Sequence, residues 1–138
     1  KIFGLAGLRI GYTLSTPANA ERINGNLMTI DLSTSALAAA IASLNDEVFM
    51  AFSKNRILEG RGMILDAVRK AGLEALPTQA NFVFVKVPDA NAVKARMAER
   101  GIIIRGAYGK WTQWSRVSTG KIEDVRRYAA ALPEVARA

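Results

Sequence analysis

The sequence contains no cysteine and no histidine among its 138 residues. The first absence excludes disulfide scaffolds, thiolate zinc sites and cysteine nucleophiles, and it fits the reducing compartment of a cytoplasmic protein. The second excludes histidine-dependent triads, a histidine general base and imidazole metal sites. Any catalysis must therefore use lysine, tyrosine, carboxylates or a bound cofactor, and we expect no metal ion.

Long apolar runs are also missing. No stretch reaches the roughly 18 to 20 apolar residues of a membrane span, and no secretory leader opens the sequence, so we expect no membrane association. Half of the residues are apolar and 22% are charged, which excludes a wholly disordered chain. The first residue is Lys1 rather than methionine, and we expect the chain to be the C-terminal portion of a larger protein.

Positive charge is in excess, with 19 Lys and Arg residues against 12 Asp and Glu and a net charge of +7. This balance predicts an anionic partner, which could be a nucleic acid, a phosphate or a carboxylate substrate. The stretch 108–116 mixes basic and aromatic residues and would also suit a single-stranded nucleic acid. The other basic residues are scattered beside acidic ones, as on solvated helix faces, and we therefore expect no nucleic-acid partner.

The first half of the chain shows helical patterns after a glycine-rich start. We predict a tight loop at 1–8, a short strand at 9–15, a helix at 18–28 that begins with Thr16 and Pro17, and an alanine-rich helix at 36–44. A long helix follows from residue 45 and ends at Gly72. Gly60 and Gly62 within it predict a bend or a close contact.

The second half alternates strand and helix. We predict a β-rich segment at 77–87, a helix at 89–100 capped by Asp89 and closed by Gly101, a buried strand at 102–105, a strand at 114–118, and a helix at 121–132 ended by Pro133. These elements would form a small α+β unit with its helices on one face of a short sheet. The domain boundary is predicted within the long helix, near residues 46–60.

Three basic residues lie where a loop is predicted to meet a strand: Lys1, Arg9 and Arg116. A neutral lysine amine forms a Schiff base with an aldehyde. An arginine eight residues later, across a loop with glycines, can turn back and bind a phosphate, and a third can bind a substrate carboxylate. Those are the requirements of pyridoxal phosphate chemistry. The glycines of this loop lack the G-x-G-x-x-G spacing, which excludes a dinucleotide site.

The segment 1–12, KIFGLAGLRIGY, resembles the cofactor-lysine segment of the fold-type-I, class I/II aminotransferases. Further blocks resemble successive parts of the same family, in the same order, at 33–46, 78–85, 101–105 and 114–120. Together they are most similar to the histidinol-phosphate aminotransferase branch. The resemblance implies an α/β fold (PLP-dependent transferase fold type I). Residues 1–50 would be the end of the large cofactor-binding domain and start of the connecting helix, and 51–138 the small C-terminal α+β domain.

The resemblance also implies roles for individual residues. Lys1 would bind pyridoxal 5'-phosphate covalently and act as the catalytic proton carrier, Arg9 would bind the cofactor phosphate, Arg116 and Arg105 would bind the substrate anion, and Asn81 would be a site-wall residue. The family's other cofactor contacts lie upstream of the lysine. Three departures from the branch bear on the substrate: Gly106 stands where proline is frequent, Ser115 where an apolar residue is usual, and the segment 121–124 (KIED) where a cap with threonine and glutamate is more frequent.

The implied reaction is a ping-pong transfer of an amino group from an amino acid or amino-phosphate, such as a histidinol-phosphate-like donor, to a 2-oxo acid such as 2-oxoglutarate. The resemblance further implies a cytoplasmic homodimer with sites near the subunit interface. Two alternatives stay open. One is a pyridoxal-phosphate-dependent decarboxylase on the same scaffold, and the other is a non-enzymatic basic module that binds nucleic acid.

Overall fold

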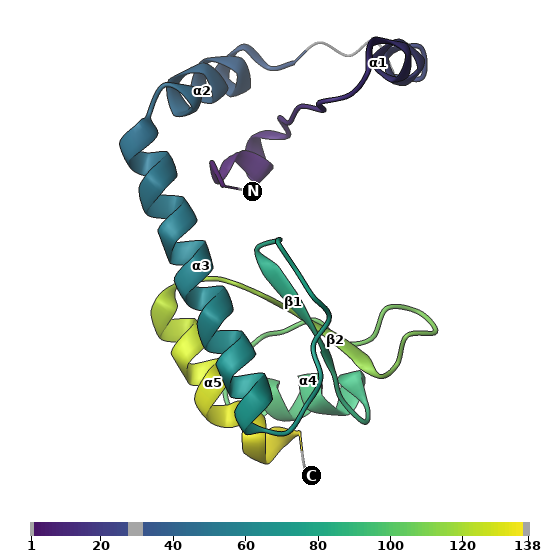
Figure 1. The fold of residues 1–138 in the computed structure, drawn as a ribbon, viewed down its shortest axis with the longest axis vertical. Helices are drawn as coiled ribbons and strands as arrows, with labels where there is room; N and C mark the ends of the chain where they lie inside the picture. Colours follow the sequence, from purple (N-terminus) through teal and green to yellow (C-terminus); the bar gives the residue numbers. More distant parts are fainter. Residues whose placement is uncertain (1, 28–31, 137–138) are drawn as a thin grey trace. The chain divides into compact units, whose positions relative to one another are not determined.

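The computed structural model describes residues 2–27 and 32–136 of the chain (Figure 1). The chain divides into two compact units, a first unit of Lys1–Ser53 and a second unit of Lys54–Ala138. Helix α3 (Glu47–Lys70) contributes residues to both.

The first unit consists of short helical elements. They are the 3-10 turn η1 (Leu5–Leu8), helix α1 (Pro17–Asn24), helix α2 (Thr34–Leu44) and the start of α3. Helix α2 contacts η1, and the Ser53 hydroxyl donates a 2.6 Å hydrogen bond to the carbonyl of Ile2. Ala36 is the single fully buried side chain among the described residues of this unit, so these residues form no core of their own.

The start of α1 was predicted correctly and the strand before it was not. The Thr16 side chain accepts a hydrogen bond from the backbone N–H of Asn19, and Pro17 occupies the first helical turn. Residues 10–16, however, form no strand. A strand needs a hydrogen-bonded neighbour, and the described part of the first unit contains no other strand to provide one.

The second unit is built on an antiparallel pair of strands, β1 (Phe82–Lys86) and β2 (Trp114–Ser118) (Figure 1). In this pair, Phe84 lies opposite Arg116. Helix α4 (Ala90–Glu99) connects the two strands, and helix α5 (Ile122–Val135) follows β2. Side chains alternate between the two faces of a strand, and the faces of this pair differ sharply. One face carries the buried valines and the other carries Arg116 and two phenylalanines.

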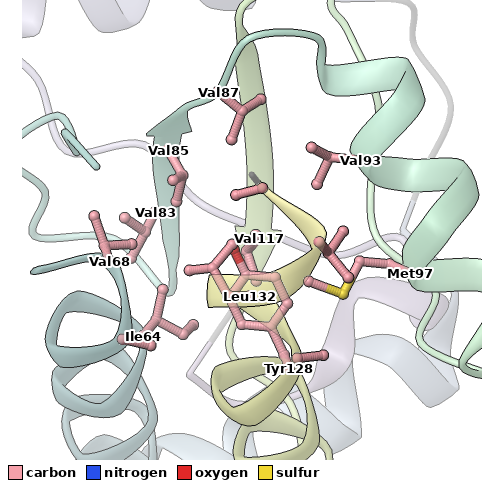
Figure 2. Close-up of a cluster of buried hydrophobic side chains, with 14 of the residues drawn as sticks. Ile64, Val68, Val83, Val85, Val87, Val93, Met97, Val117, Tyr128 and Leu132 are labelled. Carbon is pink, nitrogen blue, oxygen red and sulfur yellow. The ribbon is translucent and has the colours of Figure 1, made fainter. Parts of the chain in front are cut away.

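The valine face carries the core of the second unit, to which α3, α4 and α5 all contribute (Figure 2). Its labelled members are Ile64, Val68, Val83, Val85, Val87, Val93, Met97, Val117, Tyr128 and Leu132. Burial raises the pKa of the Tyr128 phenol, which therefore stays protonated and neutral within the core. The predicted α+β unit with helices on one face of a short sheet is confirmed, and the opposite face is left for the arginine and the aromatic rings.

Several local predictions for this unit are confirmed. The Asp89 side chain accepts hydrogen bonds from the first backbone N–H groups of α4. Gly72 and Gly101 follow α3 and α4 with φ angles of 70° and 68°, a left-handed conformation that favours glycine. Gly60 is buried, and a Cβ there would lie 3.5 Å from Thr119, which is the close contact predicted for it. Gly62 makes no such contact, because a Cβ there would meet no described atom within 4 Å.

Three predictions for the second unit are wrong in their extent or kind. The segment 102–105 is no buried strand: it makes one bridge, between Arg105 and Arg116, and Ile103 is 82% exposed. Of the predicted β-rich segment 77–87, only the residues of β1 form a strand. Pro133 lies inside the last turn of α5 rather than ending the helix.

Among the described residues, no single helix has the length and apolar character needed to cross a membrane. The bent pair of α2 and α3 meets that criterion by length and composition only.

Candidate functional site

Arg116 projects from β2 on the face opposite the core, where aromatic rings surround it. Its guanidinium carbon lies 5.0 Å from the centre of the Phe82 ring and 5.8 Å from that of the Tyr108 ring. A cation above an aromatic face is attracted by the negative potential of that face. Phe82 and Tyr108 therefore hold the charged end of Arg116 without neutralising it.

Arg105 approaches the same ring. Its guanidinium carbon lies 4.4 Å from the centre of the Tyr108 ring, and the backbones of Arg105 and Arg116 form an antiparallel bridge. In the part of the chain that the structure describes, neither arginine has a carboxylate within ion-pair distance. Two of the residues predicted to bind an anion are thus brought together without a protein counter-charge.

One polar atom at this pair is buried without a partner. The Nε of Arg116 is fully buried, and none of the described residues accepts a hydrogen bond from it. A buried donor left unpaired costs about 1–3 kcal/mol, more when it is charged. This free-energy cost is removed when an oxygen atom of a bound ligand accepts a hydrogen bond from Nε, so the Nε of Arg116 fits an anionic ligand.

An open pocket of about 620 Å³ lies beside the two arginines. Lys94 and Ser118 also line it, and no acidic residue does. Three basic side chains at one concave surface create a positive potential that favours anions over cations. Lys94 was missed in the sequence analysis, because a single lysine on a helix gives no signal that separates it from a solvated surface residue.

Two of the departures from the family pattern, Ser115 and Gly106, both contribute to holding the segment that carries Arg105. The hydroxyl of Ser115, which is buried, donates a 3.0 Å hydrogen bond to the carbonyl of Arg105. At Gly106, the absence of a side chain lets Asn91 approach, and its Oδ1 accepts a 3.0 Å bond from the backbone N–H of Ala107. Hydrogen bonds from Ser115 and to Asn91 thus connect this segment to β2 and to α4.

We expect Gly106→Ala in the full-length protein to lower the free energy of unfolding by about 1–2 kcal/mol. A Cβ at Gly106 would lie 2.4 Å from Oδ1 of Asn91 and 3.1 Å from Cδ of Lys94, so Asn91 must give up its bond to Ala107. Gly62→Ala is the control, because a Cβ at that α3 position meets nothing within 4 Å and should be tolerated. Denaturant unfolding gives both values, and an unchanged stability of Gly106→Ala would refute the packing argument.

Asn81 is placed at the start of β1, next to Phe82. Its backbone carbonyl accepts hydrogen bonds from the N–H of Thr119 at 2.8 Å and from the Thr119 hydroxyl at 3.0 Å. Asn81 does not line the open pocket beside the arginines. Its role as a site-wall residue stays a prediction.

Arg9 belongs to the first unit, where it ends η1. Its φ angle of 58° is the one positive value among the described residues other than glycine. Such a conformation costs on the order of 1–3 kcal/mol, and residues held in it cluster at functional sites. Its Nη1 donates a 3.1 Å bond to the carbonyl of Ala6, no described carboxylate pairs with it, and its side chain is exposed.

The surroundings of Arg9 fit a bound phosphate. Within the described part of the first unit, a Cβ added at Gly4, Gly7 or Gly11 would meet no atom within 4 Å, which leaves room beside the backbone near Arg9. An unpaired guanidinium is the donor that matches phosphate oxygens in charge and geometry. Lys1 lies outside the described residues, and its predicted attachment to the cofactor stays a prediction.

Comparison with known proteins identifies the family. A family model described as "Aminotransferase class I and II" matches residues 1–132. The chain belongs to this aminotransferase family. Histidinol-phosphate aminotransferase 1 of Dechloromonas aromatica is 37% identical over 134 residues, an overlap of 96% of this chain and 37% of the relative. Histidinol-phosphate aminotransferase of Nitratidesulfovibrio vulgaris is 36% identical over 138 residues, again with 37% of its length matched.

Solved aminotransferases share the fold. A putative histidinol-phosphate aminotransferase from Erwinia carotovora atroseptica matches 99% of this chain and 40% of its own, with a TM-score of 0.86 and 28% identity. The Sinorhizobium meliloti histidinol-phosphate aminotransferase, solved in complex with pyridoxal-5'-phosphate, matches 99% and 39%, with a TM-score of 0.81 and 37% identity. The predicted family and α/β fold class are confirmed. The chain spans less than half the length of these aminotransferases.

Proposed function

We propose that the protein containing this chain is a pyridoxal-phosphate-dependent aminotransferase. It would move an amino group from an amino acid or amino-phosphate donor to a 2-oxo acid. Membership of the aminotransferase family over residues 1–132 supports the reaction class. The structural observation that carries the substrate class is the pair of Arg105 and Arg116, which has an unpartnered buried Nε and no facing carboxylate among the described residues.

We also propose that residues 1–50 are the end of the large cofactor-binding domain and the start of the connecting helix, and that residues 51–138 are the small domain. The division of the structure into units at Ser53 and Lys54 supports this assignment. The contrast in burial supports it as well, because the second unit has its own core and the described part of the first unit has one buried side chain. The homodimeric state and the cytoplasmic location rest on the family resemblance alone.

Four residues of this chain would have separate roles in amino transfer. When bound, pyridoxal phosphate supplies an aldehyde that condenses with amines and a ring that accepts an electron pair. Lys1 would hold the cofactor through its ε-amino group and, once released, would take and return a proton at the α carbon of the substrate. Arg9 would bind the cofactor phosphate through paired N–H donors. Arg105 and Arg116 would neutralise and orient the substrate anion.

The experiment that tests this function is product analysis with the full-length protein. The protein is supplied with pyridoxal phosphate, 2-oxoglutarate and a panel of amino donors that includes histidinol phosphate. We expect glutamate and the oxo product of one donor in equal amounts, without carbon dioxide. Release of carbon dioxide would instead support the decarboxylase, and salt-sensitive binding of nucleic acid without any turnover would support the basic binding module.

A further inference from the structure

The ring of Tyr108 lies at the centre of the cluster on the open face of the second unit. Both guanidinium groups pack on it, that of Arg105 at 4.4 Å and that of Arg116 at 5.8 Å. The ring of Phe84 meets it edge-on, with centroids 5.8 Å apart and an angle of 63° between the planes. Among the residues that the structure describes, Tyr108 is therefore the one side chain on which both arginines pack.

The shared ring of Tyr108 offsets the repulsion between the two guanidinium groups. Two guanidinium groups on backbone segments joined by a bridge repel each other, and without a local attraction each would turn towards solvent. The negative face of an aromatic ring attracts a cation, and arginine is the cation most often found there. Tyr108 can thus keep both charges in place while it leaves their N–H groups free for a ligand.

The ring itself is held in position. The backbone carbonyl of Tyr108 accepts a 2.9 Å hydrogen bond from Trp111, and the preceding residue, Ala107, is bonded to Asn91. On the strand side, the ring of Phe82 packs edge-on against Phe84 at 5.8 Å and 89°, which continues the aromatic row under Arg116. Because both its backbone and its ring are anchored, Tyr108 presents a rigid platform.

We propose that Tyr108 is a positioning residue whose ring holds the guanidinium groups of Arg105 and Arg116 side by side, so that they bind one anionic substrate group together. The proposal rests on the proposed function for the identity of the substrate. It goes beyond that function because it assigns a role to an aromatic residue that packs on the two arginines and has no part in the amino transfer proposed above. The ring, and not the phenol hydroxyl, performs this role.

The test compares Tyr108→Leu with Tyr108→Phe in the full-length protein loaded with pyridoxal phosphate. Leucine removes the aromatic face, whereas phenylalanine keeps the face and removes only the hydroxyl. We expect Tyr108→Leu to raise the KM for the anionic donor about tenfold with kcat changed less than twofold, and Tyr108→Phe to match the wild type. A merely structural role would lower the active fraction, and hence kcat, and would leave KM unchanged.

A binding measurement makes the test independent of turnover. Inorganic phosphate is titrated calorimetrically into the cofactor-loaded protein, and we expect its dissociation constant to rise about tenfold in Tyr108→Leu and to stay unchanged in Tyr108→Phe. Tyr108→Met provides a second variant without a ring, should Tyr108→Leu fold poorly. Trp111→Leu is the matched control, because this exposed aromatic in the same hairpin packs with Lys110 and not with either arginine.

The outcomes distinguish a failure of the proposal for Tyr108 from a failure of the proposed function. Unchanged phosphate binding in both ring-free variants would overturn the proposal for Tyr108, and so would a loss in Tyr108→Phe as large as that in Tyr108→Leu. If the wild type catalyses no amino transfer, the proposed function fails. The calorimetric comparison still decides whether the ring positions the two arginines.

Discussion

Replacement of Lys1 by arginine in the full-length protein is expected to lower kcat for amino transfer by at least about 10³-fold. Arginine keeps the positive charge at this position. Its guanidinium group, however, stays protonated at any working pH, so it can neither bond to an aldehyde nor take a proton from a substrate carbon. Steady-state rates at saturating pyridoxal phosphate measure the effect.

Lys54→Arg provides the control for this change. Lys54 is exposed on α3, outside the residues assigned to the site, so its replacement should leave kcat within about twofold of the wild type, as is usual for surface substitutions. If Lys1→Arg keeps most of the wild-type rate, the assignment of Lys1 as cofactor attachment point and proton carrier is wrong. A loss shared by both variants would indicate a general sensitivity to lysine replacement.

Replacement of Arg116 by glutamine is expected to lower kcat/KM for the anionic donor by about 10²-fold, mainly through KM. Glutamine removes the charge that an anionic substrate group would meet. Arg116→Lys keeps the charge and loses the planar fork of donors, so its loss should be smaller, about tenfold. Kinetics with the donor identified by product analysis give both values.

We expect Arg116→Gln to change the stability of the protein much less than its kcat/KM. The buried Nε of Arg116 has no partner among the described residues, so removing the guanidinium takes away an unmet hydrogen bond together with the ring contacts. These effects oppose each other, and we expect the melting temperature of Arg116→Gln to stay close to that of the wild type. A strongly destabilised variant with unchanged kcat/KM would instead show that Arg116 serves only as a structural partner of Phe82. Arg100→Gln, which breaks an exposed ion pair with Glu134, is the control for general charge loss.

The features that sequence predicted well depend on near neighbours along the chain. The caps at Thr16 and Asp89 and the glycine after α3 need only a side chain within a few residues of a helix end. Strand β2 was predicted with its observed bounds because alternating residues identify a sheet surface. The strand expected at 9–15 failed because its formation depends on a partner that local sequence does not specify.

Prediction of the site from the sequence was limited in a similar way. Family resemblance pointed to Arg105 and Arg116, but it gave no sign that both converge on Tyr108, because that contact arises from a single bridge between distant backbone segments. The alternation of Phe82 and Phe84 with valines did indicate an aromatic face, and this signal was missed. Gly106 and Ser115 stood out in the sequence as departures, yet their meaning required the positions of Asn91 and the Arg105 carbonyl.

Borohydride reduction of the full-length protein is the direct test of whether Lys1 carries pyridoxal phosphate. Reduction converts a carbonyl compound joined to an amine into a stable secondary amine, which peptide mass mapping then locates. The assignment of Lys1 as the attachment point of the cofactor predicts a pyridoxyl group on its side chain. A folded protein, supplied with the cofactor and reduced under the same conditions, that carries no adduct on Lys1 would contradict it.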